Sequence, residues 1–383
     1  MATINQIYTL VNDVANESLG TTAITVKDTS TLVSLGDVVL SSATNKDKFY
    51  KSLVDRIGRT VIAVRNYKAK TRSVKRDEMD WGIVYQKISY KWKNAVDNPS
   101  WEDSTQANPF DVEVSTEAVQ KLFSKIGTFS YEDSIPDYQL FTAFTNANAM
   151  GAFISGIYTN MSNAIEVADE SLANLAIATN IAGIISKGKA TQKRNLLAEY
   201  NTMVGAGGTI ASANEALRNA DFLKYATREI KTTIDNMRSM STLYNTEDIP
   251  RFTDTDKLVV EILAQFNSAS ETYLQADAFH NELVKLPNFE SVTYWQGSGT
   301  SFAFDDVSKI HIKNTEISAE EIVQSGVIAF VHDYESAASC IYNRRSNSIY
   351  NPRAERLNVF EKADKGYLVD LSENGVVFYL AAV

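Results

Sequence analysis

The chain has 383 residues, which suggests two or three domains at roughly 100 to 200 residues each. Hydrophobic residues make up 44% and charged residues 22%, so the composition is that of a globular protein rather than a disordered or fibrous one. The formal net charge of -10 disfavours a dedicated nucleic-acid reader, because phosphates repel such a chain. A container for nucleic acid is still compatible with this charge.

The N-terminus lacks the basic and apolar regions of a signal peptide, and no apolar run reaches roughly 18 residues. Secretion and membrane spanning are therefore disfavoured. The single cysteine, Cys340, has no partner for an internal disulfide, which fits synthesis in a cytosol. Its neighbours are small or apolar, so we interpret it as a buried small hydrophobe.

The first 48 residues predict a short amphipathic helix on an extended arm. Apolar residues from Ile4 to Val14 recur at helical spacing, whereas the polar sequence that follows to about Ser42 has little periodicity. The apolar segment 49–57 is expected to dock the arm on the rest of the fold.

The pattern changes to period two over 59–92, which predicts a long β-hairpin. A two-stranded ribbon is marginal in water, so it needs a neighbour. In an acidic homo-oligomer, an acidic face of a neighbouring subunit is favoured over nucleic acid as that neighbour. A solvated turn is the other interpretation. The candidate inter-subunit contacts at the basic tip are Arg65, Lys68, Lys70, Arg72, Lys75 and Arg76.

Two helices are predicted next. Thr116 can cap a short helix over 117–126. A far longer helix is predicted over 153–179, with Lys187-Gly188 as its end, and about 35 helical residues would span about 50 Å. A helix of that length is expected to be a spine on which other elements pack. The glycine-rich segment 204–209 then predicts a loop.

The remaining sequence has a mixed α+β pattern. Ser318 to Glu321 resembles a capping box, with Gly326 as the helix stop, and the tail 356–380 alternates as β-structure does. Between the loop and the tail, the predicted helices are 214–237 and 269–278, and the predicted strands are 258–263, 292–295 and 327–331.

No motif in the sequence predicts catalysis. The segment 280–282 has the His-x-Glu pattern of a zinc deaminase but lacks the Pro-Cys-x-x-Cys partner, and 205–208 has neither dinucleotide spacing nor a P-loop lysine. The pairs Asp305-Asp306 and His332-Asp333 are expected by chance among so many carboxylates. We therefore predict no enzyme, no catalytic residue, no cofactor and no metal site.

The order of these parts resembles the tailed-phage major capsid fold of the Hong Kong ninety-seven type. The segment Asn351-Pro352-Arg353 and the region 135–188 are similar to the major head protein of the small short-tailed phages of Gram-positive bacteria. A further similar stretch precedes the hairpin and reads Phe49-Tyr50-Lys51-Ser52-Leu53-Val54-Asp55-Arg56-Ile57-Gly58.

The resemblance implies an α+β capsid fold with an arm, an extended hairpin loop, a peripheral domain with the spine helix, and an axial domain. An additional immunoglobulin-like domain is not expected. The implied boundaries are an N-terminal arm over 1–48, a strand and hairpin loop over 49–100, a peripheral domain over 101–189, an axial domain over 190–345, and a C-terminal β segment over 346–383 that returns to the peripheral domain.

The resemblance further implies a major capsid protein whose pentamers and hexamers form an icosahedral or prolate head around double-stranded DNA, without sequence-specific binding. The implied partners are other copies, a scaffolding protein, the portal and head accessory proteins, with no membrane. The protein would be assembled in the host bacterial cytoplasm and reside in the virion. An encapsulin-like nanocompartment shell, or an enzyme with an unrecognised carboxylate site, are the alternatives. A cross-link from Lys68 or Lys70 to Asn351 is disfavoured.

Overall fold

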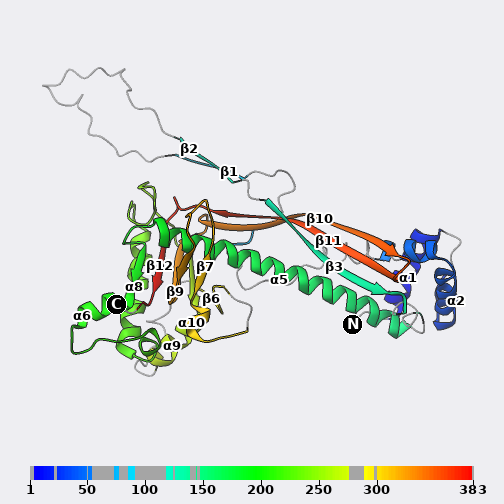
Figure 1. Ribbon diagram of the computed structural model, residues 1–383, viewed down its shortest axis with the longest axis horizontal. Helices are drawn as coiled ribbons and strands as arrows, with labels where there is room; N and C mark the ends of the chain where they lie inside the picture. The colour runs from blue at the N-terminus through cyan, green and yellow to red at the C-terminus, as the bar shows by residue number, and fades with distance from the viewer. Residues whose placement is uncertain are drawn as a thin grey trace, which may run out of the picture.

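The computed structural model describes residues 4–20, 24–49, 51–53, 73–76, 85–90, 118–123, 126–138, 144, 147–275, 289–296 and 300–381. The molecule is elongated (Figure 1). One end is an α+β body, the other is a group of short helices that we call the tip, and the long helix α5 runs between them.

The spine helix predicted from the sequence is confirmed as α5 (Ala147–Lys187), a helix of 41 residues. It ends where predicted, because the Gly188 amide donates to the Ile184 carbonyl at 2.7 Å and closes the last turn. The half of α5 next to the body is rich in alanine and isoleucine, and Ala176, Ile177 and Ile181 are almost fully buried there. These small and branched side chains let strands approach the helix closely.

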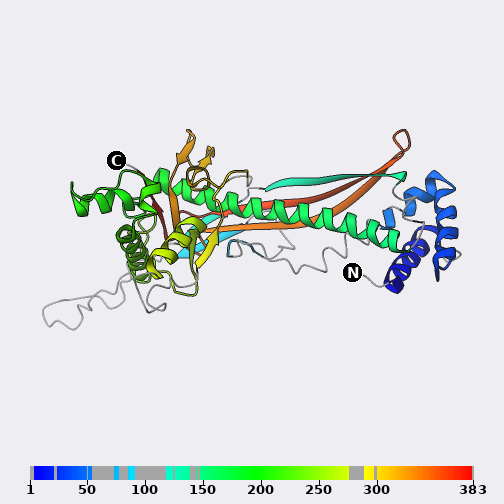
Figure 2. The ribbon, with the colours of Figure 1, turned by 90° about the horizontal axis from the view of Figure 1, so that it is seen from below.

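A three-stranded antiparallel sheet lies along α5, in the order β10-β11-β3 (Figure 2). Its strands are β3 (Ile126–Pro136), β10 (Ala337–Asn351) and β11 (Arg356–Val369), so the predicted β-tail is confirmed in this part. The turn between β10 and β11 is closed by Asn351, whose side-chain oxygen accepts the amides of Arg353 and Ala354.

The body contains a five-stranded mixed sheet in the order β4-β12-β9-β5-β6. The predicted buried strands are confirmed as β5 (Leu258–Leu263) and β9 (Val327–Asp333), and every residue of both is buried. The other members are β4 (Lys193–Asn195), β6 (Phe289–Val292) and β12 (Gly375–Tyr379). The last strand, β12, thus lies in the body and does not follow β11 along the spine.

Helices and a small two-stranded sheet surround the five-stranded sheet. The helices are α6 (Leu196–Val204), α7 (Ala213–Ala216), α8 (Ala220–Met237), α9 (Ala264–Gln275) and α10 (Phe304–Val307). The small sheet pairs β7 (Ile310–Ile312) with β8 (Ile322–Gln324). The predicted glycine-rich loop follows α6, where Gly205 has a φ of 73°.

The tip corrects the prediction of an extended arm. It contains α1 (Ile4–Leu19), α2 (Thr29–Leu40) and further helical residues at 43–49 and 51–53. Asp28 caps α2, since its side chain accepts the Thr31 amide at 2.8 Å. The buried Leu32, Leu35 and Val39 of α2 follow helical spacing, which the many serines and threonines around them obscure in the sequence.

Several other element predictions differ from the structure. The predicted helix 117–126 is wrong, because β2 (Ala118–Phe123) pairs with β1 (Tyr85–Tyr90) and the ladder overrides local propensity. The predicted capping box at Ser318 starts no helix and leads into β8. The helix predicted over 214–237 is two helices, since the Asn219 side chain caps α8 by accepting the Phe222 amide. Strand β6 ends at Val292, where the strand was predicted to begin.

Gly326 provides a test of the fold at the start of β9. Its φ is 75°, and a Cβ atom there would lie 2.1 Å from the Leu380 carbonyl oxygen, which is backbone. We expect Gly326→Ala to lower the free energy of unfolding by about 3 kcal/mol, through left-handed backbone strain and this clash. Urea unfolding followed by circular dichroism measures it.

Gly207→Ala is the matched control, because a Cβ atom at Gly207 has nothing within 4 Å. We expect a change of at most about 0.5 kcal/mol there. Equal unfolding curves for the two variants would contradict the assignment of strain to Gly326.

Candidate functional site

Strands β1 and β2 form a two-stranded antiparallel ribbon at the edge of the body, from the pair Tyr85↔Phe123 to the pair Tyr90↔Ala118. In the described part of the chain no third strand joins it. Ile88 and Tyr90 are 53% and 69% exposed, so β1 presents apolar side chains to solvent. An isolated two-stranded ribbon has only marginal stability in water. Contacts at its base must therefore fix the direction in which it leaves the body.

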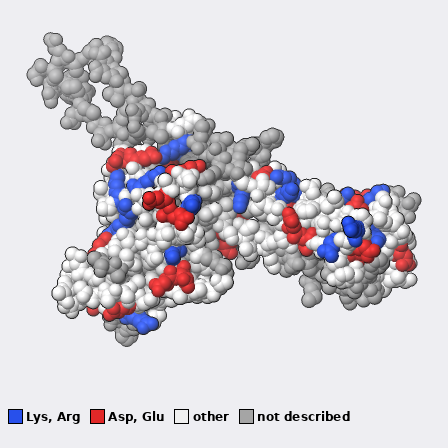
Figure 3. All heavy atoms as spheres, in the orientation of Figure 1, with Lys and Arg blue, Asp and Glu red and all other residues white. Residues whose placement is uncertain are grey.

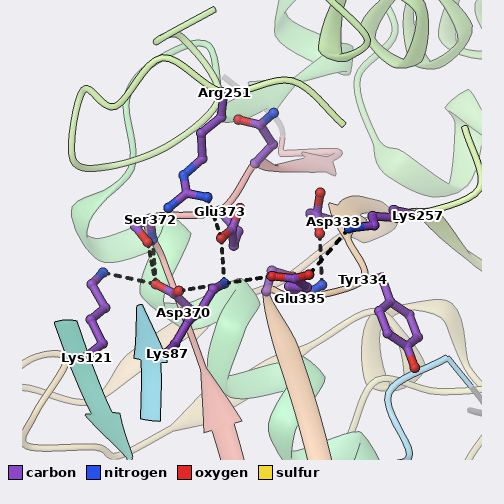
Figure 4. Close-up of polar contacts among 12 residues, drawn as sticks. Lys87, Lys121, Arg251, Lys257, Asp333, Tyr334, Glu335, Asp370, Ser372 and Glu373 are labelled. Atoms are coloured by element: carbon purple, nitrogen blue, oxygen red, sulfur yellow. Dashed lines mark hydrogen bonds and ion pairs between the residues drawn. The ribbon is translucent and has the colours of Figure 1, made fainter. Parts of the chain in front are cut away.

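Two lysines hold the base of the ribbon to the body (Figure 4). Lys87 of β1 and Lys121 of β2 are directly paired in the ladder, so their side chains leave the same face. The Lys87 Nζ atom lies 2.5 Å from Glu373 Oε1 and 3.0 Å from Asp370 Oδ2. The Lys121 Nζ atom lies 3.0 Å from Asp370 Oδ1. One carboxylate therefore bridges both strands of the ribbon.

The acidic side of this contact is the turn between β11 and β12. The amide and hydroxyl of Ser372 donate to Asp370 Oδ1 at 3.0 and 2.7 Å, which fixes the carboxylate. The Arg251 Nη1 atom lies 2.7 Å from Glu373 Oε1. We call Lys87, Lys121, Arg251, Asp370 and Glu373 the ribbon-base cluster.

Additional acids surround the ribbon-base cluster at the surface. Glu247 Oε1 lies 2.5 Å from Lys121 Nζ, and Glu335 Oε2 lies 3.4 Å from Lys87 Nζ. Figure 3 shows basic and acidic side chains side by side on the part of the body from which the ribbon projects. Charge in this region is thus compensated locally.

The protonation of the cluster follows from its burial and its charges. Burial alone would raise the pKa of Asp370, but Lys87 and Lys121 together with the Ser372 hydrogen bond lower it to about 2. Burial raises the pKa of Glu373 and outweighs the opposite effect of Lys87 and Arg251. Burial would lower the pKa of Lys87, but Asp370 and Glu373 raise it above its ordinary value. At neutral pH the bridge is therefore an ionic one.

Of the six basic residues predicted at the tip of the hairpin, the structure describes only two. Arg65, Lys68, Lys70 and Arg72 lie outside the described residues, whereas Lys75 and Arg76 belong to a short segment, 73–76, that we call the strap. Lys75 contacts Asp169 of α5, and the Arg76 Nη2 atom donates a hydrogen bond to the Tyr334 carbonyl at 2.5 Å.

Lys75 and Arg76 thus have partners in their own chain, and their contact with another subunit stays a prediction. The pairing of β1 with β2 at 118–123 was not predicted from the sequence, and most of the predicted hairpin 59–92 lies outside the described residues.

Neither Lys87 nor Lys121 is predicted as a site residue from the sequence. Lysines in a polar strand are ordinary, and only the ladder with β2 brings these two to one face. His332 is buried, Cys340 is half-buried rather than fully buried, and 280–282 lies outside the described residues.

The residues that the structure describes contain no group of three or more His, Cys, Asp or Glu side chains arranged to hold a metal ion. Among the same residues, no helix combines the length and apolar character needed to cross a membrane.

The fold is that of phage capsid proteins. A chain from the capsid structure of Staphylococcus phage Andhra matches with a TM-score of 0.51 at 11% identity, over 80% of this chain and 82% of that one. A chain from the structure of the head fiber and inner core protein gp22 of native bacteriophage P68 matches with a TM-score of 0.52 at 10% identity, over 80% and 83%. The predicted Hong Kong ninety-seven-type capsid fold is confirmed.

The sequence defines the family more narrowly. The family described as Phi29-like phage major capsid protein matches residues 11–379, and the chain belongs to this family. The "Major capsid protein" of Bacillus phage GA-1 is 26% identical over 184 residues, 45% of this chain. The match covers 36% of that relative's length. The family match thus places the chain among phage major capsid proteins.

The ribbon-base cluster predicts an acid-sensitive contribution to stability. We expect Asp370→Asn to lower the free energy of unfolding at pH 7 by about 2 kcal/mol, because the folded-state pKa of Asp370 is about 2 and its ordinary value is 3.8. The contribution is present above pH 3.8 and disappears as the pH falls towards 2. The difference between variant and parent, measured by urea unfolding, should shrink over that range.

Glu335→Gln is the control, since the Glu335 side chain is 48% exposed and its contact with Lys87 is longer. We expect at most about 0.5 kcal/mol at any pH. A pH-independent effect of Asp370→Asn would refute the ionic bridge.

Proposed function

We propose that this chain is the repeating subunit of a closed phage head, in which copies form pentamers and hexamers around double-stranded DNA. The observation that carries the proposal is the family match over residues 11–379. The acidic net charge supports an enclosing wall that does not bind its contents tightly.

In this proposal the ribbon lies over a neighbouring subunit, and the ribbon-base cluster sets the angle at which it leaves the body. The exposed Ile88 and Tyr90 support such a role, because a ribbon with apolar side chains in water gains stability from a cover. Many repeated weak contacts of this kind, rather than one strong interface, would then close the shell.

A scaffolding protein, the portal and head accessory proteins are the further proposed partners, with assembly in the host cytoplasm. The division into arm, hairpin loop, peripheral domain, axial domain and C-terminal segment stays a proposal as well. In this proposal the spine helix α5 belongs to the peripheral domain, and the body contains the axial domain.

The proposal is tested by expressing the chain with and without a candidate scaffolding protein, followed by sedimentation and negative-stain electron microscopy. We expect closed shells of uniform diameter with the scaffold. Monomers or dimers in both samples would overturn the proposal.

The ribbon base is tested in the same assay. We expect the double variant Lys87→Met, Lys121→Met to yield at least about tenfold fewer shells, because loss of the ion pairs at both lysines releases the ribbon from its fixed direction. Circular dichroism checks that the body is folded. Lys257→Met is the control, since Lys257 is exposed and lies 3.5 Å from the exposed Glu335. Equal shell yields for all three proteins would contradict the role of the cluster.

A further inference from the structure

The face of β11 that packs against α5 is apolar except at one residue. Four alternate residues of the strand are buried and share this face: Leu357, Val359, Glu361 and Ala363. Glu361 is only 5% exposed, although it is the member of this row that can ionise. A carboxyl group thus takes a position where the alternation of the strand favours an apolar side chain.

Glu361 separates two hydrophobic clusters between the sheet and the spine. On one side of it, Val359 belongs to a cluster that includes Ile165 of α5. On the other side, Ala363 packs with Leu172 of α5. Ile165 and Leu172 are about two helical turns apart. Glu361 is therefore opposite the part of α5 between them, where the apolar contact between sheet and spine is interrupted.

The buried carboxyl group has little polar compensation. Among the described residues, none donates a hydrogen bond to the buried Glu361 Oε2 atom. Ser346 is the direct ladder partner of Glu361 on β10, and its buried hydroxyl has no hydrogen-bond partner within the described ranges either. An ionised carboxylate is costly in such surroundings, so the interface favours the neutral acid.

The neighbouring strands supply three further titratable or charged groups. Tyr131 of β3 is the other ladder partner of Glu361, and Asp133 lies two residues further along the same face. Burial and the charges of Asp133 and Glu361 raise the pKa of Tyr131, which therefore stays neutral near pH 7. On β10, Arg344 is the neighbouring cation. Of these three groups, only Arg344 favours ionisation of Glu361.

The spine itself adds negative charge to this region. The stretch of α5 opposite Glu361 carries three charged residues, all acidic: Glu166, Asp169 and Glu170. Lys75 of the strap contacts Asp169, and its Nζ atom lies 3.8 Å from Glu166 Oε1. The cation that the strap brings to α5 is therefore engaged by acids of the spine.

We propose that Glu361 is a pH-sensitive point in the packing of the three-stranded sheet on α5, which fits the interface as the neutral acid and loosens it as the carboxylate. Once ionised, the carboxylate gains hydration if the sheet moves away from the helix there. The tip is joined to the body through this sheet and α5, so loosening at Glu361 lets the tip move relative to the body.

The direction of the pH dependence follows from the surroundings of the group. Burial raises the pKa of Glu361 above its ordinary value of 4.5, and the charge of Arg344 opposes this without cancelling it. A carboxyl group whose pKa is raised by folding favours the folded form below the ordinary value and loses that advantage as the pH rises through the raised value. The packing should therefore weaken as the pH rises above 4.5.

Urea unfolding of the purified full chain between about pH 4 and pH 8 tests the proposal, whether or not shells form. The variant is Glu361→Gln, which resembles the neutral acid and cannot ionise. Near pH 4 we expect equal stability for the two proteins. Above pH 4.5 the folding equilibrium constant of the parent should fall relative to the variant by up to about tenfold per pH unit, until the raised pKa is passed.

Hydrogen exchange gives a local measurement of the same effect. In the parent, protection of the segment 356–366, corrected for intrinsic exchange, should decrease over this pH range, whereas in Glu361→Gln it should stay constant. Glu132→Gln is the matched control, because Glu132 pairs with Phe360, the residue next to Glu361, and is exposed on the opposite face of the sheet. It should behave as the parent does at each pH.

A second variant keeps the test decisive if Glu361→Gln does not fold. Glu361→Leu also removes the titratable group and completes the apolar row of β11, so its protection over 356–366 should not depend on pH. Equal pH dependence in the parent and in a folded Glu361 variant would overturn the proposal. Constant corrected protection of this segment in the parent would overturn it as well.

Discussion

The packing of one long helix holds this elongated protein together. Among the described residues there are three separate hydrophobic clusters, one in the tip, one beneath the three-stranded sheet and one in the body. Helix α5 contributes to each of them through Ile165, Leu172 and the residues from Ala176 to Ile184. A compact domain would merge such clusters into one core. Here their separation along the helix makes α5 the element whose straightness sets the distance between tip and body.

Polar contacts attach the ribbon to the body and, together with the buried Val74, the strap. The ribbon is held through Lys87 and Lys121, and the strap through Ser73 and Arg76. The Asp137 carboxylate lies 2.9 Å from Lys46 Nζ and accepts a hydrogen bond from the Tyr350 hydroxyl at 2.8 Å. These contacts connect the helices of the tip to the end of the three-stranded sheet. Partly buried ion pairs of this kind fix direction better than they add stability, because desolvation offsets much of their attraction.

This distribution of forces suits a protein of the Phi29-like major capsid family. A shell subunit needs a rigid frame with attached elements whose direction can be adjusted, so that one sequence can occupy unequal positions. The hydrophobic clusters along α5 provide the frame, and the ion pairs lie at the points where elements are attached to it.

The sequence by itself determined the elements whose pattern is local and strong. The spine helix, the buried strands β5 and β9 and the alternating tail follow from apolar spacing alone, and short similar segments were enough to indicate the capsid fold. It did not determine α2, where serines and threonines hide a narrow apolar stripe, or β2, whose residues suit a helix until β1 supplies a ladder.

Only the tertiary structure brought Lys87 and Lys121 to one carboxylate, and Ser73 of the strap to Glu290. These contacts join residues far apart in the chain, and charged residues carry no periodic signal of the partner they will meet. Apolar periodicity reports which face of an element is buried, whereas the pairing of charges depends on which elements meet.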